Sequence, residues 1–169
     1  TREASWTLRN SRGQYILTLD EMEAGSLDTA EPVIEVEGDL ILQLKKDTIS
    51  HLESQGPVIK KGTGTLTIRG EGSLELESAD AEAISSDWNG EELDADHPSA
   101  VRLEAGNLTF TGAGSGIVDE TVELAGAQGT ITATSTSGAA VKTAHVKREG
   151  SNSDKLELIG ATAVAVPES

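Results

Sequence analysis

The chain has 169 residues, enough for one domain with a substantial core. Its 29 Asp and Glu residues against 13 Lys and Arg give a formal net charge of -16, which argues against binding to nucleic acid or to anionic membrane surfaces and favours divalent cations or a basic partner. The absence of cysteine excludes disulfides and thiolate chemistry, and no segment approaches the roughly 20 apolar residues of a membrane-spanning helix.

The first part of the chain differs from the rest by its larger side chains. Residues 1–31 are expected to form an N-terminal cap with the first strands, with Trp6 and Tyr15 packing over the open end of a repeat fold. The segment from Glu21 to Glu31 is acidic and unpatterned, which predicts a loop. Because the sequence begins at Thr1 rather than Met, we expect a processed protein or a piece of a longer chain, in which this domain is monomeric.

Regular strand patterns follow from residue 32. Residues 32–44 are expected to form the first regular coil, and residues 45–55 a polar excursion in which His51 is a solvated loop residue. In residues 62–78, GTGTLTIRGEGSLELES, apolar and polar residues alternate twice around Gly70, Glu71 and Gly72. A period of two places alternate residues on one face of a strand, so this stretch predicts two half-buried strands joined by a sharp bend.

The same strand pattern recurs along the chain. Aligning the leading apolar residues gives spacings of 26, 42, 23 and 25 residues, and 42 divides into two periods of about 21. The aligned residues are Leu40, Leu66, Leu108, Ile131 and Leu156. A second short phrase precedes most copies: Pro32 Val33 Ile34, Pro57 Val58 Ile59, Ala83 Ile84, Ala100 Val101, Gly116 Ile117 Val118 and Ala140 Val141.

Strands and glycine-rich turns at this period, without helical patterning, are typical of a β-solenoid. The sequence therefore predicts an all-β fold, a right-handed single-stranded parallel β-helix of about seven coils with 21–26 residues per coil. A single domain covers residues 1–169, with regular coils over residues 32–166 and an acidic insertion at about residues 86–99.

The insertion is the best functional candidate in the sequence. The carboxylates of Asp80, Glu82, Asp87, Glu91, Glu92, Asp94 and Asp96 lie within 17 residues, together with Trp88 and Asn89. Insertions in a solenoid project from one face, which is often a binding face. Carboxylate, amide and carbonyl oxygens suit calcium, which takes six to eight oxygen ligands. We expect Asp80, Glu82, Asp87, Asp94 and Asp96 to be metal ligands.

One other interpretation of the insertion stays open. The insertion does not match an EF-hand, because counting from Asp87 the sixth position is not glycine and the twelfth is Pro98. A solvated acidic loop that binds nothing is the simpler alternative. A zinc site is not expected, because His51, His97 and His145 lie far apart in sequence and no cysteine assists them.

The motifs "GDL-x-I", "GTLTI-x-G-x-GSL" and "AI-x-S-D" resemble those of bacterial parallel β-helix proteins, typified by a clostridial cell-surface protein that binds polygalacturonate. The resemblance covers about residues 32–166. It implies calcium held by acidic residues beside the "AI" strand and bridging to uronate groups. At the matching positions stand Asp80, Glu82, Asp87 and Asp119. Glu35 and Lys60 follow the corresponding strands in other coils and depart from the pattern.

The expected function is therefore a non-catalytic, secreted or bacterial cell-surface module that binds a polysaccharide or cell-surface glycan with the help of calcium. Trp88, Asn89 and Glu91 are the expected ligand-binding residues, with Trp88 stacking on a sugar. A spacer or protein-binding adhesin domain within a larger surface protein is the alternative. A polysaccharide lyase or hydrolase is the third reading, and we do not expect it, because no compact motif brings two carboxyl groups together.

Overall fold

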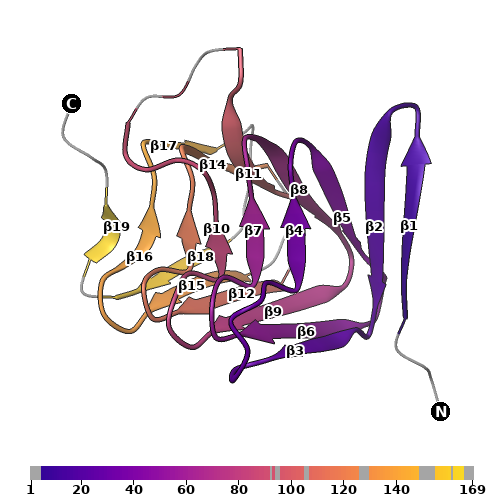
Figure 1. Ribbon diagram of the computed structural model, residues 1–169, viewed down its shortest axis with the longest axis horizontal. Helices are drawn as coiled ribbons and strands as arrows, with labels where there is room; N and C mark the ends of the chain where they lie inside the picture. Colours follow the sequence, from indigo (N-terminus) through magenta and orange to yellow (C-terminus); the bar gives the residue numbers. More distant parts are fainter. Residues whose placement is uncertain are drawn as a thin grey trace.

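The computed structural model describes residues 5–91, 93, 96–104, 107–125, 130–148, 155–160 and 162–165, and these form a parallel β-solenoid of about five turns. Three parallel sheets form its sides (Figure 1). The predicted fold class is thus confirmed as an all-β parallel solenoid, whereas the hand of the coil remains a prediction. No helix among the described residues has the length and apolarity to cross a membrane.

Each turn of the chain contributes one strand to each sheet. Sheet A contains β1 (Ser5–Ser11), β2 (Gln14–Asp20), β5 (Leu40–Leu44), β8 (Gly64–Gly70), β11 (Ser99–Leu103), β14 (Thr121–Leu124) and β17 (His145–Arg148). Sheet B contains β3 (Glu23–Ser26), β6 (Ile49–Ser54), β9 (Ser73–Ser78), β12 (Asn107–Gly112), β15 (Thr130–Ser135) and β18 (Lys155–Ile159). Sheet C contains β4 (Ile34–Val36), β7 (Ile59–Lys61), β10 (Ile84–Ser85), β13 (Ile117–Val118), β16 (Ala139–Lys142) and β19 (Thr162–Ala165).

The alternating stretch in residues 62–78 forms β8 and β9, as predicted. The bend between them requires glycine at its first position: Gly70 has a φ of 115°, and a β-carbon there would overlap the carbonyl oxygen of Leu44 in the preceding turn. The apolar side chains of both strands are buried and face the interior of the solenoid. These inward-facing residues are Leu66, Ile68, Leu74 and Leu76.

The short second phrase of the repeat is sheet C. Its apolar residues stack in register from turn to turn: Ile34, Ile59, Ile84, Ile117 and Val141. The exception is Ala100 Val101, which lies in β11 of sheet A and pairs with Thr65 and Leu66. Strands of all three sheets share the same alternation, so the phrase alone did not distinguish one sheet from another.

The same ambiguity explains the predicted number of coils. Leu40 pairs with Leu66 in sheet A, but Leu108 pairs with Leu74 and Ile131 in sheet B. The sequence alignment therefore passed from one sheet to another. The spacing of 42 residues between Leu66 and Leu108 corresponds to one turn and one further side of the solenoid, and that turn is enlarged by the acidic insertion between β10 and β11. The described strands make about five turns, and they do not show the seven coils that the sequence predicted.

A ladder of buried serines lines the corner between sheets B and C. Ser54 donates hydrogen bonds to the carbonyl oxygens of Thr29 and Glu31 at 3.0 and 2.9 Å. Ser78 and Ser135 repeat this pattern on the carbonyls of the turn before each of them. Each of these hydrogen bonds joins a buried serine hydroxyl to the backbone of the preceding turn, so the serines stabilise successive turns.

Two segments expected to be loops contain strands. β3 lies within the acidic residues 21–31, and β6 lies within the polar residues 45–55. At the start of β6 the usual placement of apolar residues inside and polar residues outside is reversed, because Ser50 is buried while Ile49 is exposed. His51 is accordingly a half-buried residue on the outer face of sheet B, and the prediction of a solvated loop residue was wrong.

The N-terminal hairpin does not close the end of the solenoid. β1 pairs with β2 in antiparallel fashion and extends sheet A by one strand, while sheets B and C end at β3 and β4 (Figure 1). Every residue of β1 is exposed. Trp6 and Tyr15 are 57% and 52% exposed, so they do not pack as the cap that the sequence predicted.

Candidate functional site

The acidic insertion leaves the solenoid at the corner between sheets C and A, after β10 and before β11. Its base is fixed to the next turn by two hydrogen bonds. The Ser86 hydroxyl donates to the carbonyl oxygen of Val118 at 2.9 Å, and the Leu93 amide donates to Glu120 Oε2 at 2.8 Å. Neighbouring turns make the same corner with two residues, Gly62 and Thr63 or Asp119 and Glu120.

A buried ion pair lies inside this corner. Lys61 is the last residue of β7 and points inward, as Ile59 does, because the two residues are separated by one position in a strand. Its Nζ lies 2.7 Å from Oδ2 of Asp119, which follows β13, and both side chains are 0% exposed. Since β10 lies between β7 and β13 in sheet C, the pair spans the turn that carries the insertion.

The polar atoms of this pair are all satisfied. Lys61 Nζ also donates to the Ser99 hydroxyl at 2.7 Å and to the carbonyl oxygen of Gly62 at 3.2 Å. Asp119 Oδ1 accepts from the Ser99 hydroxyl at 2.5 Å and from the Glu120 amide at 2.7 Å. A buried charge is tolerated when it is paired and hydrogen-bonded in this way. The arrangement is structural, and it joins three turns of the solenoid at the base of the insertion.

The structure separates the predicted calcium ligands. Asp80 and Glu82 lie in the turn between sheets B and C, whereas Asp87 and Asp96 lie in the insertion at the other end of β10. Asp119 is occupied by its three donors and would have to release Lys61 to bind a cation. Asp94 lies outside the described residues. Among the residues that the structure describes, none of these carboxylates joins a group of three imidazole or carboxylate ligand atoms within 4.8 Å.

Asp87 nevertheless has an acidic neighbour that the sequence did not indicate. Gly62 lies between the carboxylates of Glu37 and Asp87, which come from the turns on either side of it. A β-carbon at Gly62 would collide with the Glu37 carboxylate. Two exposed carboxylates are far fewer than the six to eight oxygens of a calcium site, so this pair gives calcium little support.

The predicted ligand-binding residues of the insertion differ in exposure. Trp88 is only 3% exposed and its amide donates to the Ser86 hydroxyl at 3.3 Å. Its ring is therefore not presented as a platform for a sugar. Asn89 and Glu91 are exposed, and Asn89 Oδ1 accepts a hydrogen bond from the Glu91 amide at 3.2 Å, which closes a local turn.

The open N-terminal end of the solenoid holds a second candidate site. An apolar cavity of about 700 Å³ lies between the inward face of the β1–β2 hairpin and the first strands of sheets B and C. Trp6 and Leu8 of β1 are 57% and 55% exposed and line the cavity on the side of sheet A. Its other walls are built from the side chains of Met22, Ala24, Val33, Ile34, Val36, Leu40 and Leu52.

The rim of this cavity is acidic. Glu35, Glu37 and Asp39 line it beside the apolar residues of β4, and among the residues that the structure describes no lysine or arginine lines it. β1, β3 and β4 are the outermost strands of their sheets, so their outer edges present backbone N–H and C=O groups. The cavity thus combines an apolar floor, carboxylates at its rim and free strand edges.

The chain was compared with protein-family models, curated proteins and solved structures, and none of them matches it. No family or homologue is thereby identified, and the functional argument depends on the geometry of this chain alone.

Proposed function

We propose that this solenoid is a non-catalytic protein-binding module that docks through its N-terminal end onto an extended segment of a partner protein. The segment would present apolar side chains on one face and lysines or arginines near the rim. The observation that supports this proposal is the open apolar cavity of about 700 Å³ beneath the β1–β2 hairpin. It is the protein-binding alternative that the sequence leaves open.

The apolar character of the end favours a macromolecular partner. Trp6 and Leu8 pair with Leu19 and Leu17. Tyr15 lies two positions before Leu17 in β2, so it shares the same face of the hairpin. Soluble proteins rarely expose contiguous apolar patches of this kind unless the patch binds something. Tryptophan and tyrosine are also enriched among the residues that dominate the energy of protein interfaces.

The geometry of the end favours an extended segment. Sheet A continues to β1, whereas sheets B and C stop one strand earlier, at β3 and β4. A chain that paired with the edge of β4 or β3 would lie under the apolar face of β1 and complete the missing side of a turn. Such strand addition supplies main-chain hydrogen bonds, and the cavity supplies pockets for alternate side chains.

The charge of the end favours a basic segment and disfavours a second copy of this chain. Glu35, Glu37 and Asp39 lie at the rim, and the whole chain has a formal net charge of -16. Two such ends would bring like charges together, which costs binding energy, whereas lysine or arginine beside the apolar residues would be attracted. Attraction of this kind weakens as salt is added.

Selection from a library of displayed ten-residue peptides against the purified chain tests the proposal. We expect the selected peptides to alternate apolar with other residues, to contain lysine or arginine, and to bind less tightly at 0.5 M than at about 0.1 M salt. The double variant Trp6→Ser/Leu8→Ser should lose binding. Ile49→Ser is the matched control, because Ile49 is an exposed apolar residue, 62% exposed, on sheet B away from the cavity.

Three outcomes would overturn the proposal. The first is peptide binding that survives the Trp6→Ser/Leu8→Ser change or is lost equally in Ile49→Ser. The second is a concentration-dependent dimer in sedimentation that the same double variant abolishes, since the occupant of the cavity would then be a second copy. The third is the absence of selected peptides together with a strictly monomeric chain.

A further inference from the structure

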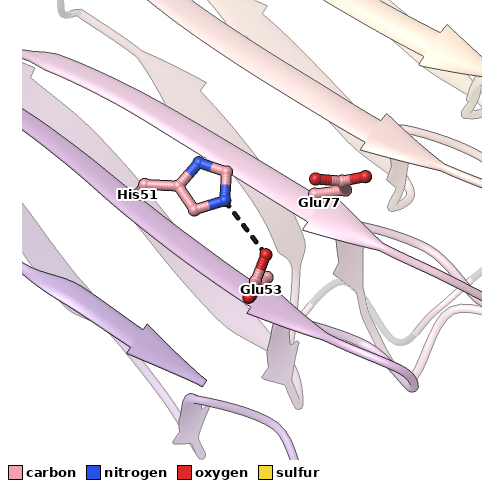
Figure 2. A group of neighbouring side chains, drawn as sticks. All are labelled: His51, Glu53 and Glu77. Atoms are coloured by element: carbon pink, nitrogen blue, oxygen red, sulfur yellow. Dashed lines mark hydrogen bonds and ion pairs between the residues drawn. The ribbon is translucent and has the colours of Figure 1, made fainter. Parts of the chain in front are cut away.

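We propose that the outer face of sheet B carries a binding site for a divalent transition metal ion of the zinc class, formed by His51, Glu53 and Glu77. One ligand atom from each of these side chains lies within 4.8 Å of the other two (Figure 2). The site is independent of the N-terminal cavity, so it does not rest on the function proposed above.

Strand geometry brings the three residues together. His51 and Glu53 are two positions apart in β6 and therefore point to the same side of the sheet. Glu77 of β9 is the in-register partner of Glu53 on the neighbouring strand. All three side chains are half-buried. They lie close to one another on β6 and β9 in Figure 2. A site on two hydrogen-bonded strands is held more rigidly than a site on a loop.

The distances are close to those of a metal site. His51 Nε2 lies 3.2 Å from Glu53 Oε2. In tetrahedral coordination with bonds of about 2.0–2.1 Å, two ligand atoms are about 3.3 Å apart. His51 and Glu53 are already at this separation, and a carboxylate oxygen of Glu77 lies within 4.8 Å of both ligand atoms. Water would fill the remaining position.

The charge around the cluster supplies a second, independent argument. Glu53 and Glu77 are directly opposed on adjacent strands, and Glu23 and Glu75 are the register partners of His51. Opposed like charges destabilise a sheet. The strands β3, β6, β9, β12 and β15 contain no lysine or arginine.

In sheet A, by contrast, an arginine pairs with neighbouring carboxylates. There Arg102 contacts Glu104 at 2.8 Å and the neighbouring strand's Glu123 at 2.9 Å. In β6 and β9 the opposed glutamates have a histidine and no lysine or arginine beside them on their own strands, with Glu75 Oε1 3.7 Å from His51 Nδ1. A bound divalent cation would neutralise this concentration of negative charge.

The mixed donor set selects the class of metal. Calcium and magnesium prefer all-oxygen sites, whereas an imidazole nitrogen with carboxylates suits zinc, cobalt, nickel or copper. The sequence argument against zinc required several histidines or cysteines close together in the chain. One histidine is enough here, because pairing between β6 and β9 supplies the carboxylate from a different turn.

Calorimetric titration of chelator-treated, tag-free chain with Zn²⁺, and visible absorption of the Co²⁺ complex, test this site. We expect one ion to bind per chain, with a Co²⁺ spectrum of low coordination number and no displacement by a hundredfold excess of Ca²⁺. The melting temperature should rise with Zn²⁺ by mass action.

Matched variants separate this site from adventitious binding. His51→Gln and Glu77→Gln should each weaken Zn²⁺ binding at least tenfold and melt like the parent in chelator. His145→Gln, which alters an exposed histidine in β17 of sheet A, should bind Zn²⁺ as the parent does. No saturable binding, unchanged binding in both His51→Gln and Glu77→Gln, or ready displacement by Ca²⁺ would overturn the proposal.

Discussion

Lys61 and Asp119 meet inside the solenoid although the strand between them belongs to another turn. The Nζ to Oδ2 distance is 2.7 Å, and Ser99 hydrogen-bonds to both residues. Adjacent strands are about 4.8 Å apart, so β7 and β13 are separated by nearly 10 Å. A long side chain on one side is needed to cross that gap. The pair thus closes the corner that the insertion interrupts.

Replacement of Lys61 should test the stability of this corner. We expect Lys61→Met to lower the free energy of unfolding by about 3–5 kcal/mol, because Asp119 would remain as a buried, unpaired charge. The neighbouring change Lys60→Met, at an exposed position of the same strand, should cost about 0.5 kcal/mol or less. Urea unfolding measures both. Equal losses in the two variants would contradict the assignment of a buried pair.

Replacement of Asp119 at the same corner tests directly whether this residue binds calcium. Because Asp119 is already paired with Lys61, we expect Asp119→Asn to lower the melting temperature by the same amount in calcium and in chelator. If Asp119 held calcium, the parent alone would gain stability from the ion by mass action. A calcium-dependent rise in melting temperature that disappears in Asp119→Asn would restore that residue as a ligand.

The serine ladder should stabilise the corner between sheets B and C. The Ser78 hydroxyl donates to the Gly56 carbonyl at 2.7 Å and accepts from the Ala81 amide at 3.0 Å. We expect Ser78→Ala to cost about 1–3 kcal/mol, because both partly buried backbone groups would lose their hydrogen-bond partner. Ser73→Ala changes an outward residue of the same strand and should be nearly neutral. Chemical denaturation compares the two.

Two glycines with positive φ distinguish backbone strain from steric overlap. Gly38 has a φ of 87° with open space around a β-carbon, whereas at Gly70 a β-carbon would overlap the Leu44 carbonyl oxygen. We expect Gly38→Ala to cost about 1–2 kcal/mol from the left-handed conformation alone. Gly70→Ala should cost at least twice as much in the same unfolding experiment. Similar costs at both positions would show that the preceding turn moves to make room for the added β-carbon at Gly70.

The solenoid itself could be predicted because its signal is local. Alternation around Gly70 and the apolar column of Ile34, Ile59 and Ile84 follow directly from the pleat of a strand. The number of turns could not, because strands of the three sheets look alike and the insertion lengthens one turn. β6 escaped prediction for a related reason, since Ser50 and Ser54 occupy inward positions that apolar residues usually take.

The sites could be predicted less well because they depend on stacking between turns. Lys61 and Asp119 lie 58 positions apart, and nothing near either residue indicates its partner. His51 and Glu77 likewise come together only through the register of β6 and β9. The open cavity depends on where each sheet ends, which follows from the pairing of β1 with β2 rather than from any motif.

The most direct test of the docking surface is the exposure of Trp6 with and without a selected peptide. In the variant Trp88→Phe, which removes the buried tryptophan, the remaining fluorescence comes from Trp6. We expect acrylamide to quench this emission readily in the free chain, with a several-fold loss of quenching and a blue shift when the peptide saturates it. Quenching of Trp6 that is unchanged at saturation would show that the peptide binds elsewhere, and would contradict docking at the N-terminal end.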